Sequence, residues 1–534
     1  MKLKLTSYTT AAIIGLLTLP GNVIAEELRV GVAAMATSTD PHFHRSGYNM
    51  SLRENISDAL VYANTYNGKL EPRLATNWEN LDETTWKLQL NSNARFSNGN
   101  PFGVDDIIYS FCRVPNVEGS PGAFTGFIRD VKDIRDGGDG SVIMETSGPN
   151  PVLLRSLAKI GIIENPTGQL LKYDKEECGN DQWLSSEKFN DGTISSGIGP
   201  YTVTKFTAGV ELILERNSDY YGERPFYSKV TVKSIPENGA RIAALLGNNV
   251  DLINSVPING IERIQNEGSF ELASTPATRL IFLGMDQESE PTPKVSGTND
   301  KNPFKDIRVR KAFNLAIDRQ GIVDKIMGGI ASPTSTIVTE SLFGANPDLK
   351  LYPYDPEQAK KLLAEAGYPD GFTLTLNAPS DRYVNGSQVA QAVAQMLAKI
   401  GIDVTLETFP KSVYFKKASA FEYSVYLAGS GADTGEGLYQ NIHIAGTRDK
   451  TKGWGGANRA RYSSSVTDGY LRKGQVTLDE KKREALVRDA LKQVYDDYGL
   501  IALYHEMGVW AHKANIYFEP SANQRNIYYR ARSK

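Results

Sequence analysis

The sequence predicts an α/β protein built in more than one lobe. Strand and helix patterns alternate along most of the 534 residues, a length beyond one ordinary domain. One βαβ-like unit is clear, because a helical pattern that opens at Ser387 separates two apolar strand patterns, Phe372–Leu376 and Val404–Phe409. Two parallel strands need such a crossover between them.

Strand patterns dominate the first half of the chain. Thr85–Leu90 and Lys229–Ile235 alternate polar and apolar residues, as half-buried strands do, and residues 212–216 repeat the pattern. The turn signal at 98–101 precedes a short predicted helix, Val104–Arg113.

Helices in the second half have clear start and stop signals. Asp306 can cap one helix, and Asp355 followed by Pro356 starts another, because the carboxylate accepts from free amides and proline suits the first turn. Gly367 ends that second helix. The longest predicted helix is Asp479–Tyr498.

The N-terminus, Met1–Ala25, is typical of a cleavable secretory signal. Lys2 and Lys4 give a positive start, Ala11–Leu19 is apolar but too short to span a bilayer, and small residues stand at the cleavage position. A first core helix or a membrane anchor is the alternative. No later segment has about 18 consecutive apolar residues, so we expect a periplasmic protein that is not embedded in the membrane.

Charge and cysteine content exclude several classes of protein. The formal net charge is −3, from 59 basic and 62 acidic residues, which argues against nucleic acid as a partner. Export permits a disulfide, and Cys112 and Cys178 are the only two cysteines. We expect them to be bonded, with two separate buried thiols as the alternative.

Signatures of catalysis are missing. The chain has neither the Gly-x-Ser-x-Gly motif of α/β-hydrolases nor a phosphate-binding loop ending in Gly-Lys-Ser/Thr. His505-Glu506 begins like a zinc-protease motif, but Val509 stands where the second histidine is needed, so a strand near the core is favoured. We therefore expect neither an enzyme nor a cofactor.

His42 and His44 form a second candidate for ligand chemistry. Two residues apart, they would point the same way on a strand. They could contribute to a transition-metal or haem site, with His443 as the obvious third ligand. The alternative is a loop whose imidazoles make hydrogen bonds or contact a polar ligand.

The glycine-rich segment Gly429–Gly437 is the most unusual stretch. Its glycines allow close backbone approach, and a half-buried Asp433 would attract a primary ammonium through charge-assisted hydrogen bonds. An acidic surface loop is the alternative.

Several motifs together resemble one family, the large substrate-binding proteins of dipeptide and oligopeptide ABC importers, also called family 5 extracellular solute-binding proteins. The matching segments occur in order over nearly all of the mature chain: 74–79, 96–99, 105–106, Gly197–Tyr201, Asn302–Arg319, Tyr354–Pro369 and Ile400–Ile402.

The resemblance implies a two-lobed periplasmic-binding-protein fold of type II, in the large cluster with an extra subdomain and a hinge between the lobes. Lobe I would comprise 26–278, with a subdomain near 69–190, and the chain would return to it at 503–534. Lobe II would comprise 279–502. Lobes of this kind close around a ligand by a hinge motion.

The resemblance also implies a ligand and its contacts. A short peptide would be delivered to an inner-membrane ABC permease, and we expect a monomer. Asp433 matches the residue that pairs with a peptide α-ammonium, Gly429, Ser430 and Gly431 would pair with the peptide main chain, and Arg382 lies near the segment that binds its carboxylate. Ser430 stands at or near the place of the family's usual tryptophan. Haem, a nickel chelate or an opine- or sugar-like amine is the alternative ligand in the same fold.

Overall fold

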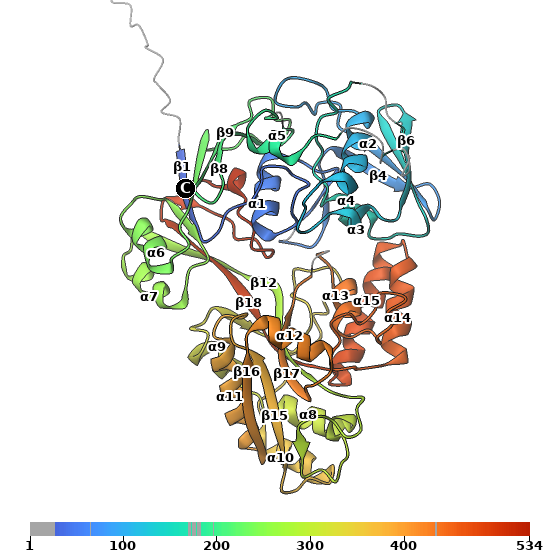
Figure 1. The fold of residues 1–534 in the computed structure, drawn as a ribbon, viewed down its shortest axis with the longest axis vertical. Coiled ribbons are helices and arrows are strands. Elements are labelled where there is room, and N and C mark those ends of the chain that lie inside the picture. Colours follow the sequence, from blue (N-terminus) through green and yellow to red (C-terminus); the bar gives the residue numbers. More distant parts are fainter. Residues whose placement is uncertain are drawn as a thin grey trace, which may run out of the picture.

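The computed structural model describes residues 27–64, 66–168, 172–173, 178, 183–195, 197–432 and 435–534. The expected signal peptide, Met1–Ala25, and Asp433 lie outside these residues. Two lobes are stacked one above the other, and two long antiparallel strands, β12 (Phe270–Met285) and β18 (Ile501–Lys513), run between them (Figure 1). The two-lobed α/β fold expected from the resemblance is confirmed.

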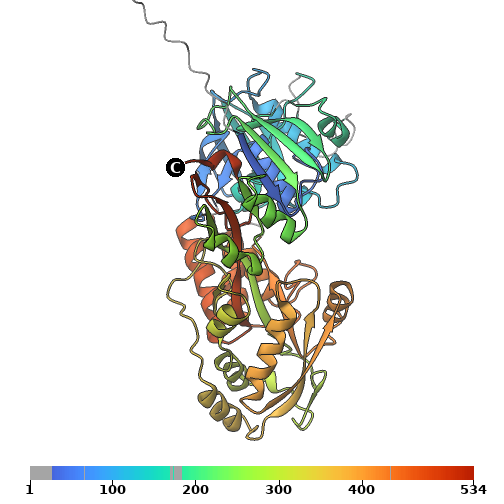
Figure 2. The ribbon, with the colours of Figure 1, turned by 90° about the vertical axis from the view of Figure 1, so that its left-hand side faces the viewer.

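One sheet continues through both lobes. Its 12 strands include the path β13-β15-β17-β12-β18-β11-β1-β10-β9-β8, so β12 and β18 are its middle. Seen from the side, one lobe lies above the other and the strand pair runs between them (Figure 2).

Lobe I is built on the half of the sheet that contains β1. This strand pairs in parallel with β10 and β11, and its buried residues Leu28 and Val30 pack in a core with Leu214, Val230 and Trp510. The strands are β1 (Glu27–Val32), β8 (Tyr201–Thr207), β9 (Glu211–Arg216), β10 (Lys229–Ser234), β11 (Leu252–Asn254), β19 (Ile516–Tyr517) and β20 (Arg532–Ser533). The helices are α1 (Gly47–Ile56), α6 (Asn238–Leu246) and α7 (Ile258–Asn266), with a 3₁₀ turn at Tyr528–Arg530.

The part of the chain from Val61 to Asn190, which includes the region where a subdomain is expected near 69–190, contains a sheet and an apolar cluster. Its four-stranded sheet has the order β4-β5-β7-β6, and Leu88, Phe96 and Phe111 are buried in its apolar cluster. The strands are β2 (Val61–Ala63), β3 (Leu70–Pro72), β4 (Ala75–Asn80), β5 (Thr85–Leu90), β6 (Val131–Gly138) and β7 (Ser141–Thr146). The helices are α2 (Val104–Arg113), α3 (Thr125–Ile128), α4 (Leu153–Leu157) and α5 (Ser186–Asn190), with a 3₁₀ turn at Val114–Asn116.

Lobe II is a three-layer arrangement, with helices on both faces of its half of the sheet. The predicted βαβ unit is confirmed, since β15 and β16 pair in parallel and α11 joins them. The strands are β13 (Val295–Ser296), β14 (Ala331–Pro333), β15 (Phe372–Pro379), β16 (Ile402–Phe409) and β17 (Val425–Ser430). The helices are α8 (Ile307–Leu315), α9 (Arg319–Lys325), α10 (Pro356–Glu365), α11 (Gly386–Ala398), α12 (Lys411–Ser419), α13 (Gly437–Ile444), α14 (Ser465–Val476) and α15 (Glu480–Asp496), with a 3₁₀ turn at Pro303–Lys305.

The predicted helix caps of lobe II are present. The carboxylate of Asp306 accepts from the Arg308 amide, and Asp355 accepts from the Gln358 amide. The helix expected from Ser387 begins one residue earlier, at Gly386, because Asn385 takes a left-handed conformation and turns the chain into it. Caps therefore set the starts of these helices as local sequence predicts.

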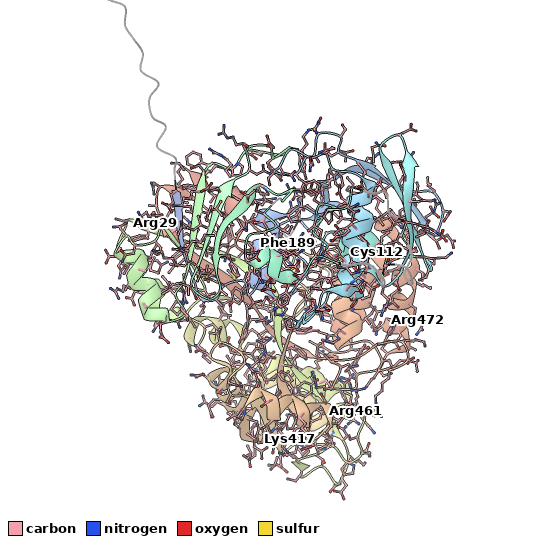
Figure 3. The ribbon with its side chains drawn as sticks, turned by 45° about the horizontal axis from the view of Figure 1, so that its top comes forward. Arg29, Cys112, Phe189, Lys417, Arg461 and Arg472 are labelled. Atoms are coloured by element: carbon pink, nitrogen blue, oxygen red, sulfur yellow. A yellow bond between two sulfur atoms is a disulfide. The ribbon has the colours of Figure 1, made fainter. Side chains whose placement is uncertain are left out.

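The expected disulfide is also present. Cys112, on α2 in lobe I (Figure 3), is bonded to Cys178, with 5.0 Å between the Cα atoms. The Asn116 side-chain amide donates to the carbonyls of both cysteines, at 2.9 Å each. The bond and this amide together hold Cys178 against α2.

Replacing both cysteines by alanine is expected to lower the free energy of unfolding by about 2–4 kcal/mol. The bond closes a loop over a sequence separation of 66, and its loss leaves the unfolded chain with more conformations. Urea unfolding of oxidised protein, reduced protein and the double variant measures the effect. Identical urea midpoints for oxidised and reduced wild type would contradict the prediction.

Candidate functional site

The candidate site lies at one edge of the lobe II sheet. β15 pairs in parallel with both β16 and β17, so the carboxyl ends of these three strands meet at the same edge. Ligands of open α/β sheets bind outside the carboxyl ends of strands. The residues that follow the strands there include Arg382, Lys411 and Gly431, and the Lys411 amide donates to Asp381 Oδ1 at 2.7 Å.

This edge faces lobe I. β17 pairs antiparallel with β12, and Ser430, at the carboxyl end of β17, lies opposite Leu280. Leu280 comes just after the part of β12 that pairs within lobe I, and the Thr278 amide donates to the Ala522 carbonyl of that lobe at 3.0 Å. The carboxyl edge therefore lies where the two lobes meet.

A tyrosine fixes the backbone of the glycine-rich segment. The Gly429 amide donates to Tyr383 Oη at 2.7 Å. A Cβ atom at Gly429 would lie 2.8 Å from Tyr383 Cε1 and 2.9 Å from Ile281 Cδ1, so a larger residue cannot fit without movement. Burial raises the pKa of Tyr383, and the ring also lies 5.5 Å from the Arg382 guanidinium. Gly429 and Arg382 are thus brought together through Tyr383.

Ser430 and Gly431 complete the segment at the edge. The Ser430 carbonyl accepts from Gln440 Nε2 at 3.0 Å, which ties the strand end to α13. Gly431 is exposed, and a Cβ there would have only Thr278 Oγ1 near it, at 3.8 Å. Open space above Gly431 leaves its backbone accessible to a ligand.

Sequence reasoning missed an ion pair at the same edge. Leu280 lies opposite both Ser430 and His505, and the next residues toward lobe I are Arg279 and Glu506. Arg279 Nη1 contacts Glu506 Oε2 at 3.2 Å. Burial raises the pKa of Glu506, while the charges of Arg279 and Arg382 oppose that shift. His505-Glu506 is part of β18, as the sequence favoured, but only the register of β12 and β18 brings Arg279 to it.

A buried carboxylate anchors the far end of the glycine-rich segment. Glu436 is fully buried, and its Oε2 lies 2.6 Å from Arg483 Nη1 in lobe II and 3.4 Å from Arg155 Nε in lobe I. Arg155 also donates to the Gly68 carbonyl at 2.7 Å. The segment that carries Asp433 is therefore tied to both lobes at this end, beside the helices α13 and α15 (Figure 1).

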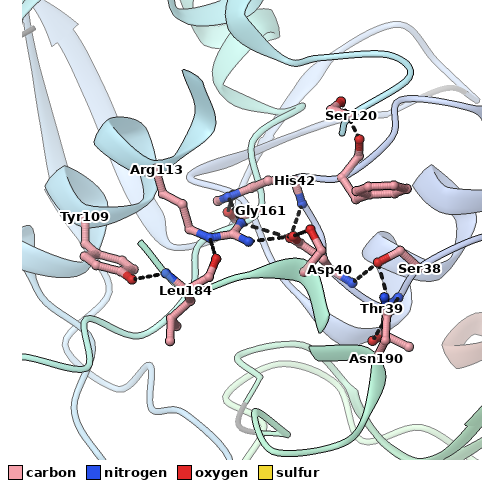
Figure 4. A network of polar contacts seen from close by, with 12 residues as sticks. Ser38, Thr39, Asp40, His42, Tyr109, Arg113, Ser120, Gly161, Leu184 and Asn190 are labelled. Atoms are coloured by element: carbon pink, nitrogen blue, oxygen red, sulfur yellow. Dashed lines mark hydrogen bonds and ion pairs between the residues drawn. The ribbon is translucent and has the colours of Figure 1, made fainter. Parts of the chain in front are cut away.

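His42 lies in a buried network within lobe I (Figure 4). Its Nε2 donates to the Gly161 carbonyl at 2.6 Å, so Nδ1 accepts from Arg113 Nη1 at 3.1 Å and the ring is neutral. Burial lowers the pKa of His42 to about 4, and the charge of Arg113 acts in the same direction. Burial alone would raise the pKa of Asp40, but its ion pair with Arg113, at 2.5 Å, lowers it.

The network joins the loop after β1 to the subdomain. Ser186 Oγ, at the start of α5, donates to Asp40 Oδ2 at 2.6 Å, and Arg113 comes from α2. His42 lies in a turn and not on a strand, whereas His44 is half-buried and forms a bridge with Gly122. His443 lies on α13 of lobe II. The structure therefore does not place these three histidines in one group, and among the residues that it describes no set of three or more His, Cys, Asp and Glu side chains could hold a metal ion.

No helix in the described part of the chain is long and apolar enough to cross a membrane.

Comparisons with known proteins agree on one family. Residues 69–452 match the family described as "Bacterial extracellular solute-binding proteins, family 5 Middle". The probable D,D-dipeptide-binding periplasmic protein DdpA of Escherichia coli K12 is 25% identical over 489 residues, which cover 90% of this chain and 88% of that protein. Heme-binding protein A of Haemophilus influenzae is 23% identical over 486 residues, which cover 87% of this chain and 84% of that protein.

A solved structure supports the same fold. HbpA2 from Haemophilus parasuis matches with a TM-score of 0.81 at 20% identity, over 95% of this chain and 100% of that chain. The family match assigns the chain to the solute-binding proteins, and the two lobes with a sheet that continues between them agree with that class. The chain belongs to the bacterial extracellular solute-binding proteins of family 5.

The His42 network predicts a specific pH dependence of stability. The pKa of His42 is about 4 in the folded state and about 6.5 in an unfolded chain, so between these values only the unfolded state binds the proton. Stability therefore falls as the pH falls from about 6.5 to 4. His42→Gln should reduce this slope by about 1 kcal/mol per pH unit.

Urea unfolding at several pH values between about 6.5 and 4 measures that slope. Ser38→Ala is the control, because it removes a hydrogen bond to Asn190 in the same network without removing a titrating group. It should lower stability equally at each pH. A slope unchanged by His42→Gln would refute the prediction.

Removing the charge of Glu436 is expected to be costly. Glu436→Gln leaves the buried guanidinium groups of Arg155 and Arg483 without their carboxylate, which should lower the free energy of unfolding by about 3–5 kcal/mol. Glu357→Gln is the matched control, since that side chain is 76% exposed and pairs with Lys360 on α10. Its effect should stay below about 1 kcal/mol, and equal losses for the two variants would contradict the expected role of burial.

Proposed function

We propose that this protein captures short peptides between its two lobes and delivers them to an ABC permease of the inner membrane. The observation that carries the proposal is the exposed backbone of Gly431, which follows β17 at the carboxyl edge facing lobe I. An extended peptide can pair with such a strand end through main-chain hydrogen bonds, independently of its side chains. The similarity to DdpA, a probable D,D-dipeptide-binding periplasmic protein, also supports peptide binding.

The proposed contacts use charges at the two ends of the peptide. Asp433 would pair with the α-ammonium, and Arg382, exposed at the same edge, would pair with the carboxylate. Gly429, held by Tyr383, and Ser430, held by Gln440, keep the segment between these charges in place. The protein would bind its solute without changing it, as a monomer in the periplasm.

A non-peptide solute such as haem or a nickel chelate is the second candidate, and the heme-binding relative of Haemophilus influenzae favours it. His42 does not support it, because both ring nitrogens contact groups of lobe I. Protein purified from its own periplasm separates the candidates. Native mass spectrometry should find bound peptides, and visible absorbance or retained metal would favour the second candidate instead.

Asp433→Asn is expected to weaken binding of peptides with a free N-terminus by about 1.5–3 kcal/mol, the contribution of a hydrogen bond to a charged group. N-acetylated peptides of the same sequence should lose much less. Calorimetric titration of both peptide forms measures the difference. Equal losses would remove Asp433 from the ammonium role, and unchanged affinity for every peptide would show that the residue does not contact the ligand.

A further inference from the structure

Three charged side chains meet where the lobes join. Arg279 comes just before Leu280 on β12, Glu506 lies beside Arg279 on the neighbouring strand β18, and Arg382 follows the end of β15. The charges of both arginines act on the Glu506 carboxyl. Arg279 is in direct contact with the Glu506 carboxylate, and Arg382 acts on it through its charge, so these three groups together carry one positive charge in excess.

The side chains differ in their access to solvent. The side chain of Glu506 is 11% exposed, whereas that of Arg279 is 37% exposed. Arg382 is exposed as well. The Glu506 carboxylate is thus less accessible to solvent than the two guanidinium groups beside it.

The ion pair between Arg279 and Glu506 consists of a single long contact. A guanidinium has five N–H donors and can hold a carboxylate with two parallel bonds at about 2.7–2.9 Å. Among the described residues, Arg279 contacts Glu506 through Nη1 alone, at 3.2 Å. Its remaining N–H groups can donate to a second carboxylate without breaking a strong existing bond.

We propose that Arg279 is a second anion-binding residue of the candidate site, beside Arg382, and that a carboxylate of the ligand shares Arg279 with Glu506. The inference rests on the proposed function, and it adds that the preferred ligands carry a carboxylate positioned at the hinge. The amide of Thr278, which is adjacent to Arg279, donates to the Ala522 carbonyl of lobe I. Arg279 would therefore bind the ligand carboxylate where the chain passes from one lobe to the other. Glu506 keeps Arg279 in place and competes with the ligand for it.

Competition of this kind predicts opposite effects for two variants. Arg279→Met should weaken binding of carboxylate ligands about tenfold or more, because one cation is lost. Glu506→Gln should strengthen their binding severalfold, because Arg279 is released from its internal partner. Both variants should bind the corresponding amides within about twofold of wild type, since amides carry no charge.

The experiment uses matched pairs of ligands on the whole protein. Short peptides with a free carboxylate are compared with their C-terminal amides by calorimetry, and small non-peptide acids with their amides by thermal shift. Arg308→Met is the control variant, since it removes an arginine paired with Asp306 at the start of α8, at the far end of lobe II (Figure 1). Urea unfolding first establishes that each variant is folded.

The outcomes separate the two levels of the proposal. Equal losses for acids and amides in Arg279→Met, or weaker acid binding in Glu506→Gln, would overturn the role of Arg279 and leave peptide capture standing. If only the non-peptide acids show the expected pattern, the anion-binding role of Arg279 is supported and peptide capture is overturned. No binding from either ligand set would overturn both.

Discussion

The antiparallel pair of β12 and β18 is the constraint on which the structure depends. Within lobe I the two strands pair from Phe270 opposite Lys513 to Pro276 opposite Met507, and within lobe II they pair again from Leu280 opposite His505. The register shifts between Pro276 and Leu280, so the ladder is interrupted where the lobes meet. Each lobe is thus attached to its own part of the pair, and a second irregularity follows between Ile281 and Phe282.

The candidate site lies beside this interruption, because Ser430 at the end of β17 is opposite Leu280. The carboxyl ends of β15 and β17 bring Arg382 and the glycine-rich segment to one edge, and the register of β12 and β18 places the Arg279–Glu506 pair beside them. Tyr383 and Gln440 hold the backbone there from two sides. In the proposed function this prepares the hydrogen-bonding groups of the segment for an extended ligand, so that main-chain contacts supply general affinity and a few charges decide which solutes bind.

Local sequence signals were sufficient for much of the fold. The caps at Asp306 and Asp355, the βαβ unit and the disulfide follow from nearby residues and from the cysteine count. Contacts that depend on long-range register could not be predicted in this way. Arg279 and Glu506 are 227 residues apart, and nothing in either local sequence signals their pairing.

The histidines show the same limit. His42 and His44 suggested a ligand site because their spacing is regular, but burial against Arg113 and Gly161 makes His42 part of the interior of lobe I. Nothing in the glycine-rich sequence signals the role of Glu436, although its carboxylate contacts arginines of both lobes. A charged residue gains its role here from what the fold places around it.

The return of the chain to lobe I sets an order for assembly. Asn55 of α1 donates to the Asn526 carbonyl at 2.9 Å and accepts from the Tyr528 amide at 2.9 Å, and Trp510 of β18 donates to Asn526 Oδ1 at 2.7 Å. These bonds form only after residues 501–528 have been synthesised, whereas lobe II is one continuous stretch. The part of the protein that is made first is therefore the part that is finished last, and its unpaired strand edges need protection until the final segment arrives.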